Sequence, residues 1–114
     1  MSKLVTLLLL SSNAFLAQDL EGTWEDRSGG IFGGESGWDK CEFRYDNTFL
    51  CTNYPKLGSL VLPFEGTWKL IGSTLTLRLN SSHIIKTHIA EIDQDFFRGL
   101  VEGGNKFTFN RKKP

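Results

Sequence analysis

The chain has 114 residues with 13 basic and 13 acidic side chains, so it has no formal net charge at neutral pH. This length suits a single domain, and a balanced charge gives no field that would draw the protein to nucleic acid or an anionic membrane. Nine Phe and three Trp supply enough apolar surface for a packed core, and twelve Gly beside three Pro favour strands joined by tight turns. The composition therefore excludes a disordered chain and favours one small β domain.

The N-terminal segment has the order of a secretory signal peptide. Lys3 precedes a short apolar run over 4–10, and small polar residues follow it. Cleavage after Ala14 or after Ala17 fits the pattern, and we favour Ala17, which makes 1–17 the signal peptide and 18–114 the domain; a buried N-terminal strand or helix is the alternative. The apolar run is shorter than the roughly 20 residues that span a bilayer. We expect a secreted or periplasmic protein with no membrane span.

Alternating apolar and polar residues predict the first strand over 20–25. Gly22 and Trp24 share one face of this strand, so Trp24 points inward. The glycine-rich stretch 28–37 follows and is typical of a long mobile loop, which we regard as a candidate lid.

Both cysteines lie in a predicted β-hairpin over 38–52, whose two alternating runs flank the turn former Asp46-Asn47. A three-residue loop with Asn47 in the left-handed region places Phe43 opposite Phe49 and Cys41 opposite Cys51. Directly opposed positions are close enough for a disulfide, and an exported chain meets the oxidant that forms one. We predict a Cys41–Cys51 bridge, with two buried free thiols as the alternative.

Pro63 makes the apolar run 60–64 a strand edge, bulge or bend, and short strands then follow one another over 65–70, 74–79, 83–92, 96–102 and 106–111, separated by polar turns. Counting the earlier ones gives seven or eight strands, the pattern of a sandwich or an up-and-down barrel. A barrel leaves no exposed strand edge. We therefore predict an all-β fold, a small up-and-down antiparallel β-barrel of seven or eight strands.

A four-residue sequence occurs twice, as Glu21-Gly22-Thr23-Trp24 and as Glu65-Gly66-Thr67-Trp68. Glycine at Gly22 and Gly66 lets the chain bend or approach a neighbour closely where a bulky inward Trp is placed. We expect a structural role for both glycines.

The opening Leu20-Glu21-Gly22-Thr23-Trp24, and the Gly66-x-Trp68 strand with the Leu-alternating strand after it, resemble the lipocalin-like (calycin-type) β-barrel domains of small exported bacterial proteins. The resemblance covers most of the domain. In that class an Arg near the last strand packs over the first-strand Trp. The resemblance thus implies a structural role for Arg111 over Trp24.

The inward-facing residues form the candidate ligand site because an apolar molecule would suit a wall of aromatic rings, although a small barrel is often filled by its own side chains. These candidates are Trp24, Phe43, Phe49, Phe64, Trp68, Leu77, Phe107 and Phe109.

The sequence contains no pattern that predicts catalysis or metal binding. His83 and His88 are five residues apart, which on a strand directs them to opposite faces. Neither a nucleophile elbow nor a phosphate loop nor metal-ligand spacing is present. We expect no enzyme activity, catalytic residue, metal or cofactor.

Two functions are therefore expected as alternatives. The first is an exported lipocalin-like protein that binds a small apolar or amphipathic molecule. The second is a periplasmic or secreted inhibitor or immunity factor that binds a protein, with exposed Ile31, Phe32, Tyr45 or Tyr54 as interface anchors. A continuous cavity favours the first, and a filled barrel with an exposed aromatic favours the second.

Overall fold

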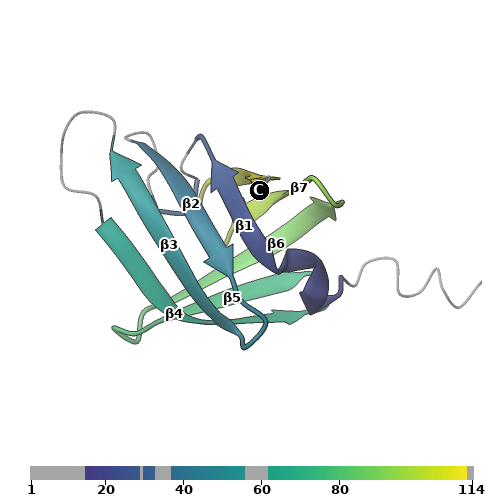
Figure 1. Cartoon of the computed structure of the whole chain (residues 1–114), viewed down its shortest axis with the longest axis horizontal. Helices are drawn as coiled ribbons and strands as arrows, with labels where there is room; N and C mark the ends of the chain where they lie inside the picture. The colour runs from purple at the N-terminus through teal and green to yellow at the C-terminus, as the bar shows by residue number, and fades with distance from the viewer. Residues whose placement is uncertain (1–14, 29, 33–36, 56–61, 113–114) are drawn as a thin grey trace, which may run out of the picture.

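A computed structural model describes residues 15–28, 30–32, 37–55 and 62–112, so most of the predicted signal peptide lies outside the described residues. The elements are η1 (Ala17–Leu20), β1 (Gly22–Asp26), β2 (Gly37–Phe43), β3 (Thr48–Pro55), β4 (Leu62–Ile71), β5 (Thr74–Leu79), β6 (Ile84–Ile92), β7 (Phe96–Val101) and β8 (Lys106–Arg111). All neighbouring strands are antiparallel, and β1 also pairs with β8 through Trp24 opposite Arg111. The result is a closed up-and-down barrel of eight strands, which confirms the predicted fold (Figure 1).

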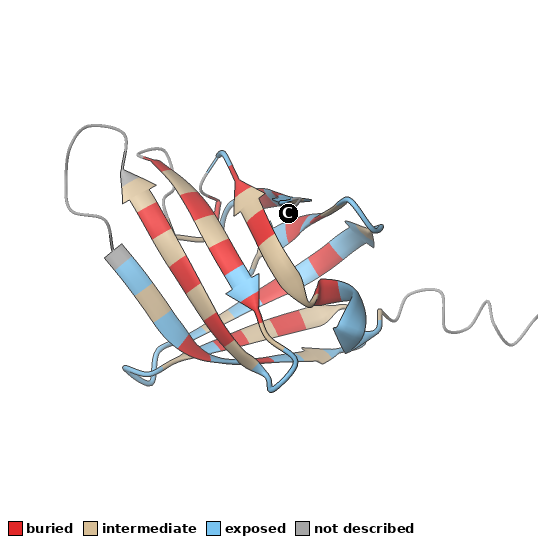
Figure 2. Ribbon diagram, viewed as in Figure 1, coloured by how far each residue is buried: buried red, intermediate tan, exposed pale blue. Residues whose placement is uncertain are grey.

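Alternate residues along each strand face the interior, as the period-2 patterns predict. Figure 2 shows this as bands of buried residues that alternate with more exposed ones. The cross-strand register arranges the inward side chains in layers: Cys41 lies between Trp24 and Cys51, and Phe43 between Gly22 and Phe49. Inward residues of β1, β2 and β3 that are paired in register therefore form layers of the core.

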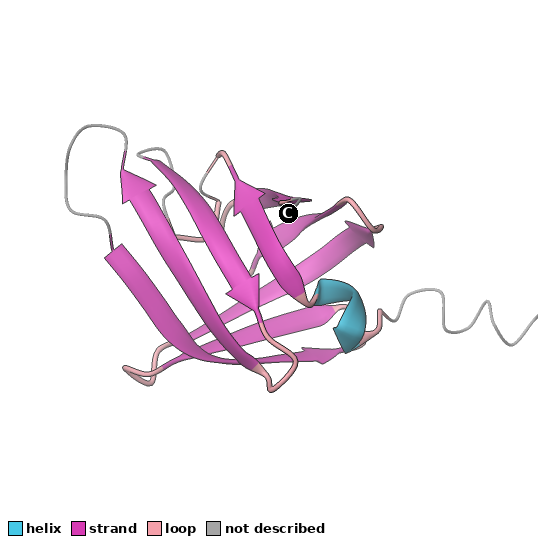
Figure 3. Cartoon of the chain, viewed as in Figure 1, coloured by secondary structure: helices cyan, strands magenta, loops and turns pink. Residues whose placement is uncertain are grey.

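Strands that alternate in direction give the barrel two distinct ends. The η1 end carries η1 and the turns β2–β3, β4–β5 and β6–β7, and the loop end carries the β1–β2 connection and the other three. Figure 3 shows the short helix η1 at its end of the barrel. The predicted first strand began at Leu20, but Leu20 belongs to η1, where its carbonyl accepts a hydrogen bond from Trp24 Nε1 at 2.8 Å. The side-chain pattern alone does not reveal this helical turn.

The Cys41–Cys51 disulfide is present and wholly buried, and Asn47 takes φ 69°, so the predicted hairpin register is confirmed. The bridge joins residues only ten apart, so the loop that it closes is short. Its stabilisation should be modest for that reason.

We expect the double replacement Cys41→Ala with Cys51→Ala to lower the free energy of unfolding by about 2–3 kcal/mol. Urea unfolding followed by tryptophan fluorescence measures the change, with the untreated wild type as reference. Wild-type protein unfolded with a reductant present should show a similar loss. Equal stability of the wild type and the double variant would contradict this estimate.

Candidate functional site

The predicted ligand-site residues form the centre of the barrel. Seven of the eight have exposed fractions of 0–3%, and Phe64 is half-buried at the loop end. The wall of an internal cavity counts as accessible surface, so these values leave the seven side chains with almost no surface that water could touch. The interior there is filled by the protein itself, and ligand binding by these residues stays a prediction that requires the barrel to open.

Phe97, absent from the predicted set, lies at the middle of the aromatic core. Its ring centroid is 4.8 Å from Trp24 at a nearly perpendicular angle and 5.1 Å from Phe109 in a stack. It also contacts the rings of Phe43 and Phe107. Consecutive Phe96 and Phe97 make the inward face ambiguous in the sequence, which explains the omission.

Arg111 closes the core at the η1 end. Its Cζ lies 4.1 Å from the Trp24 ring centroid, and Nη1 donates to the Glu21 carbonyl at 2.8 Å. Gly22 takes φ 126°, and a Cβ there would lie 2.5 Å from Arg111 Nη1. The glycine thus provides both the backbone conformation and the space that the guanidinium occupies.

Two buried carboxylates face the interior at the loop end, a feature that the sequence analysis missed. Asp26 is opposite Asp39 in the register, and their exposed fractions are 1% and 0%. Asp26 accepts hydrogen bonds from the backbone N–H groups of Ser28, Gly30 and Thr108. One carboxylate therefore ties the β1–β2 loop to β8.

Asp39 holds the next part of the same loop. Its Oδ2 accepts from Phe32 N at 3.0 Å, and its Oδ1 accepts from Asn53 Nδ2 at 3.0 Å. Burial raises the pKa of the Asp39 carboxyl above its ordinary value, the bonds from Phe32 and Asn53 oppose that rise, and the charge of Asp26 adds to it. The folded protein therefore disfavours the ionised form of the Asp39 carboxyl.

Burial of this kind predicts an unusual pH dependence for Asp39→Asn. Because the pKa of the Asp39 carboxyl is raised in the native state, this group stabilises the folded protein below the unfolded pKa of about 3.9. The stabilisation is lost as pH rises through the native pKa. We expect the stability of Asp39→Asn relative to the wild type to rise from pH 4 to pH 7, because only the wild type loses stability as the carboxyl ionises.

Asp46→Asn is the matched control, because hydrogen bonds from Thr48 lower the pKa of the Asp46 carboxyl. Its contribution has the opposite sign and is lost as pH falls through the native pKa. Urea unfolding at the two pH values measures both variants. A stability difference between Asp39→Asn and the wild type that stays constant or falls from pH 4 to pH 7 would contradict the raised pKa of Asp39.

The described part of the β1–β2 loop covers the loop end of the barrel. Phe32 stacks on Phe64 with centroids 4.5 Å apart, and Ile31 packs against the core. A Cβ on Gly30 would lie 2.3 Å from the Lys106 carbonyl oxygen, so glycine is required for this close approach to β8. The expectation that Ile31 and Phe32 are exposed is wrong, because both are half-buried in this cover.

The outer face of β1, β2 and β3 carries a second set of rings. Trp38 stacks on Tyr54 at 4.4 Å, and Arg27 Cζ lies 4.2 Å from the Trp38 centroid. Tyr54, expected to be exposed, is half-buried in this stack. Beside it lies an open groove of about 740 Å³, lined by Gly22, Thr23, Lys40, Glu42, Leu50, Thr52, Tyr54, Arg111 and Lys112. The lining mixes charges of both signs with hydroxyls and selects no single ligand chemistry.

The turn between β2 and β3 presents Tyr45, the remaining anchor expected for a protein partner. Its exposed fraction of 84% exceeds that of every other large apolar side chain that the structure describes. The expectation of an exposed Tyr45 is therefore confirmed.

Both histidines are exposed, and within the described ranges no three His, Cys, Asp or Glu side chains gather as metal ligands. His88 instead contacts Thr74 and Glu102. Across the same described ranges, no helix has the length and apolar character needed to cross a membrane.

Comparison with known proteins identifies the fold and no family. No family model and no curated protein matches the chain. The NMR structure of a protein from Bacteroides uniformis ATCC 8492 is similar, with a TM-score of 0.65 and 15% sequence identity, over 91% of this chain and 98% of that one. The similarity therefore extends over nearly the whole of both chains and concerns the barrel fold.

Proposed function

We propose that the protein is an exported binding module that recognises a protein partner through its surface, with the barrel as a rigid scaffold. The observation that carries this proposal is the filled interior, where Trp24, Leu77 and Phe109 have no exposed surface. An aromatic side chain is presented to solvent instead, at Tyr45. Exposed Tyr is among the side chains that contribute most to binding at protein interfaces.

Export is supported by the signal-peptide pattern over 1–17 and by the Cys41–Cys51 bridge, which persists in oxidising compartments. Phe15 N donates to the Gly72 carbonyl at 3.2 Å, a contact that cleavage after Ala14 keeps and cleavage after Ala17 removes. A lipocalin-like identity is supported by Gly22-x-Trp24 and by Arg111 over the Trp24 ring. Export and a lipocalin-like identity are both parts of the proposal.

In the test, tagged protein is the bait, and proteins that bind it are captured from the exported fraction of its own host. We expect a partner protein at one-to-one stoichiometry that survives size-exclusion chromatography and is displaced by excess untagged protein. A captured species that untagged protein does not displace would be non-specific. The absence of any displaceable protein would overturn the proposal.

The second candidate function, binding of a small apolar molecule, is favoured by one observation at the loop end. The rings of Phe32 and Phe64 are stacked, with 14° between their planes. A flat apolar ligand that displaced the loop would stack on Phe64 in the place of Phe32. The probe is 1-anilinonaphthalene-8-sulfonate, whose fluorescence rises in apolar sites. Saturable binding by the wild type that Phe64→Ala abolishes and Tyr45→Ala preserves would support this candidate over the first.

A further inference from the structure

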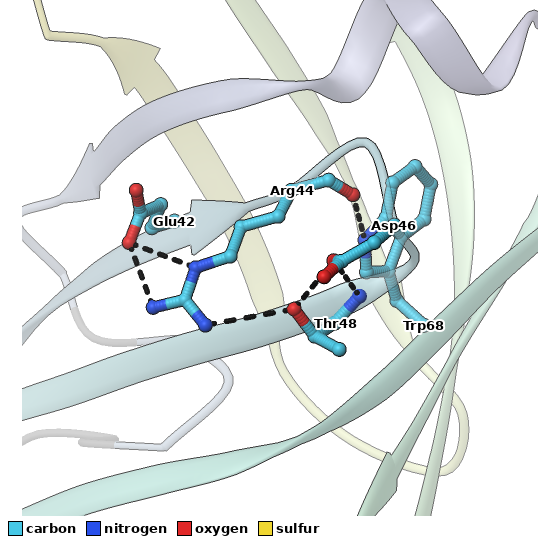
Figure 4. A network of polar contacts seen from close by, with 5 residues as sticks. All are labelled: Glu42, Arg44, Asp46, Thr48 and Trp68. Atoms are coloured by element: carbon cyan, nitrogen blue, oxygen red, sulfur yellow. Dashed lines mark hydrogen bonds and ion pairs between the residues drawn. The ribbon is translucent and has the colours of Figure 1, made fainter.

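The turn over 44–47, which we name the hairpin tip, projects Tyr45 from the η1 end of the barrel. Leu16, just before η1, and Ile71, at the end of β4, lie at the same end of the barrel and are 61% and 66% exposed. The backbone and polar side chains of the hairpin tip form a connected network (Figure 4).

Hydrogen bonds within the turn fix the shape of the hairpin tip. Asp46 Oδ1 accepts from Thr48 N at 3.0 Å and from Thr48 Oγ1 at 2.7 Å. Arg44 N donates to the Thr48 carbonyl, and Asn47 N donates to the Arg44 carbonyl, each at 2.9 Å. A turn held by this many local bonds loses little further conformational freedom when it binds.

The barrel wall holds the hairpin tip in position through Trp68. Its indole Nε1 donates to the Arg44 carbonyl at 3.1 Å, and its backbone N donates to the Asn47 carbonyl at 2.8 Å. The Trp68 ring is itself buried against Phe43. Hydrogen bonds therefore hold the backbone on both sides of Tyr45 in position, while the Tyr45 side chain is exposed to solvent.

The charges at the hairpin tip select a partner chemistry. The Arg44 guanidinium donates to Glu42 Oε1 at 3.0 and 3.2 Å, which leaves that pair neutral as a unit. Asp46 is fully exposed and stays ionised, because hydrogen bonds from Thr48 lower its pKa. Asp46 therefore places one negative charge beside Tyr45.

We propose that the hairpin tip is the interaction surface, and that its partner is a folded protein with an apolar pocket for the Tyr45 ring and a Lys or Arg beside it for Asp46. This inference rests on the proposed function. A projecting, preorganised ring fits a concave site, and a charge at the rim sets the rate and salt dependence of association.

The experiment is a displacement series in the exported fraction of the host, with tagged wild type as bait and untagged variants as competitors. Tyr45→Ala removes the ring from an exposed position, and Asp46→Asn removes the charge while keeping an acceptor for Thr48. Ile84→Ala, at a partly exposed position near the loop end, is the control. Thermal unfolding verifies that each variant is folded.

We expect Ile84→Ala to displace the partner as well as the wild type does. Tyr45→Ala should require about 30-fold more competitor, the loss typical of an interface hot spot. Asp46→Asn should require about threefold more at low salt, with the deficit vanishing at high salt.

Equal displacement by wild type and folded Tyr45→Ala would overturn the hairpin tip as the surface while leaving the proposed function standing. No displaceable partner for the wild type would overturn both. Vesicles of zwitterionic or anionic lipid test a membrane partner: binding that Tyr45→Ala abolishes would replace the protein partner with a lipid surface. A doubled mass in light scattering that Tyr45→Ala abolishes would replace it with a second copy of this chain.

Discussion

Trp24→Ala is expected to lower the free energy of unfolding by about 3–5 kcal/mol, the usual cost of removing a buried aromatic ring. Trp24 is fully buried, packs against Phe97 and lies under Arg111. Its Nε1 bond to the Leu20 carbonyl also fastens η1 to the barrel. The variant thus loses a core contact, the cation–π contact and the anchor of η1 together.

Urea unfolding measures this loss, and Trp24→Phe keeps the experiment informative if the alanine variant does not fold. Phe retains most of the apolar contact but has no indole N–H, so we expect an intermediate loss. Tyr45→Ala, at an exposed turn, should change stability by less than about 0.5 kcal/mol. A loss from Trp24→Ala as small as that control would show that the interior is loosely packed.

Gly66→Ala is expected to destabilise the barrel by about 3 kcal/mol, at the upper end of the usual cost of overpacking. A Cβ at this position would lie 1.9 Å from the carbonyl oxygen of Arg78 and 2.9 Å from Leu79 Cα. Both atoms belong to the backbone of β5, so relief requires one strand to move away from the other.

Gly104→Ala is the matched control, because a Cβ there lies no closer than 3.9 Å to Val101. We expect this variant to differ little from the wild type in urea unfolding. If Gly66→Ala unfolds at the same urea concentration as Gly104→Ala, the close approach of β4 and β5 at Gly66 is wrong.

The strands and the hairpin could be predicted because their signals are local. Alternation along 74–79 determines which side chains face inward, and the turn at Asp46-Asn47 sets the register that brings Cys41 to Cys51. The count of seven or eight strands became eight because the run after Pro63 belongs to one continuous strand, β4, and β8 pairs with β1 to close the barrel.

The loop end could not be predicted in the same way. The glycine content over 28–37 indicated a mobile loop, but Gly30 permits close packing on β8, and Asp26 and Asp39 bind the loop backbone. Alternation does place Asp26 on the face of Trp24 and Asp39 on the face of Cys41. The signal for two inward carboxylates was therefore present, but their partners come from a loop whose path has no period.

The candidate binding surface was foreseen only as a set of four possible anchors. Three of the four pack against neighbouring rings or the core, namely Ile31, Phe32 and Tyr54. Of the four, Tyr45 alone has a largely exposed side chain. Exposure of a turn residue depends on what packs against the turn, which the local sequence does not specify.

Native mass spectrometry of the protein, purified from its own host without denaturation, distinguishes a protein partner from a small-molecule cargo. We expect the bare mass of the disulfide-bonded chain, together with a second species whose excess mass is that of one protein partner. A reproducible excess in the small-molecule range, lost on denaturation, would refute the protein partner and identify the barrel as a carrier.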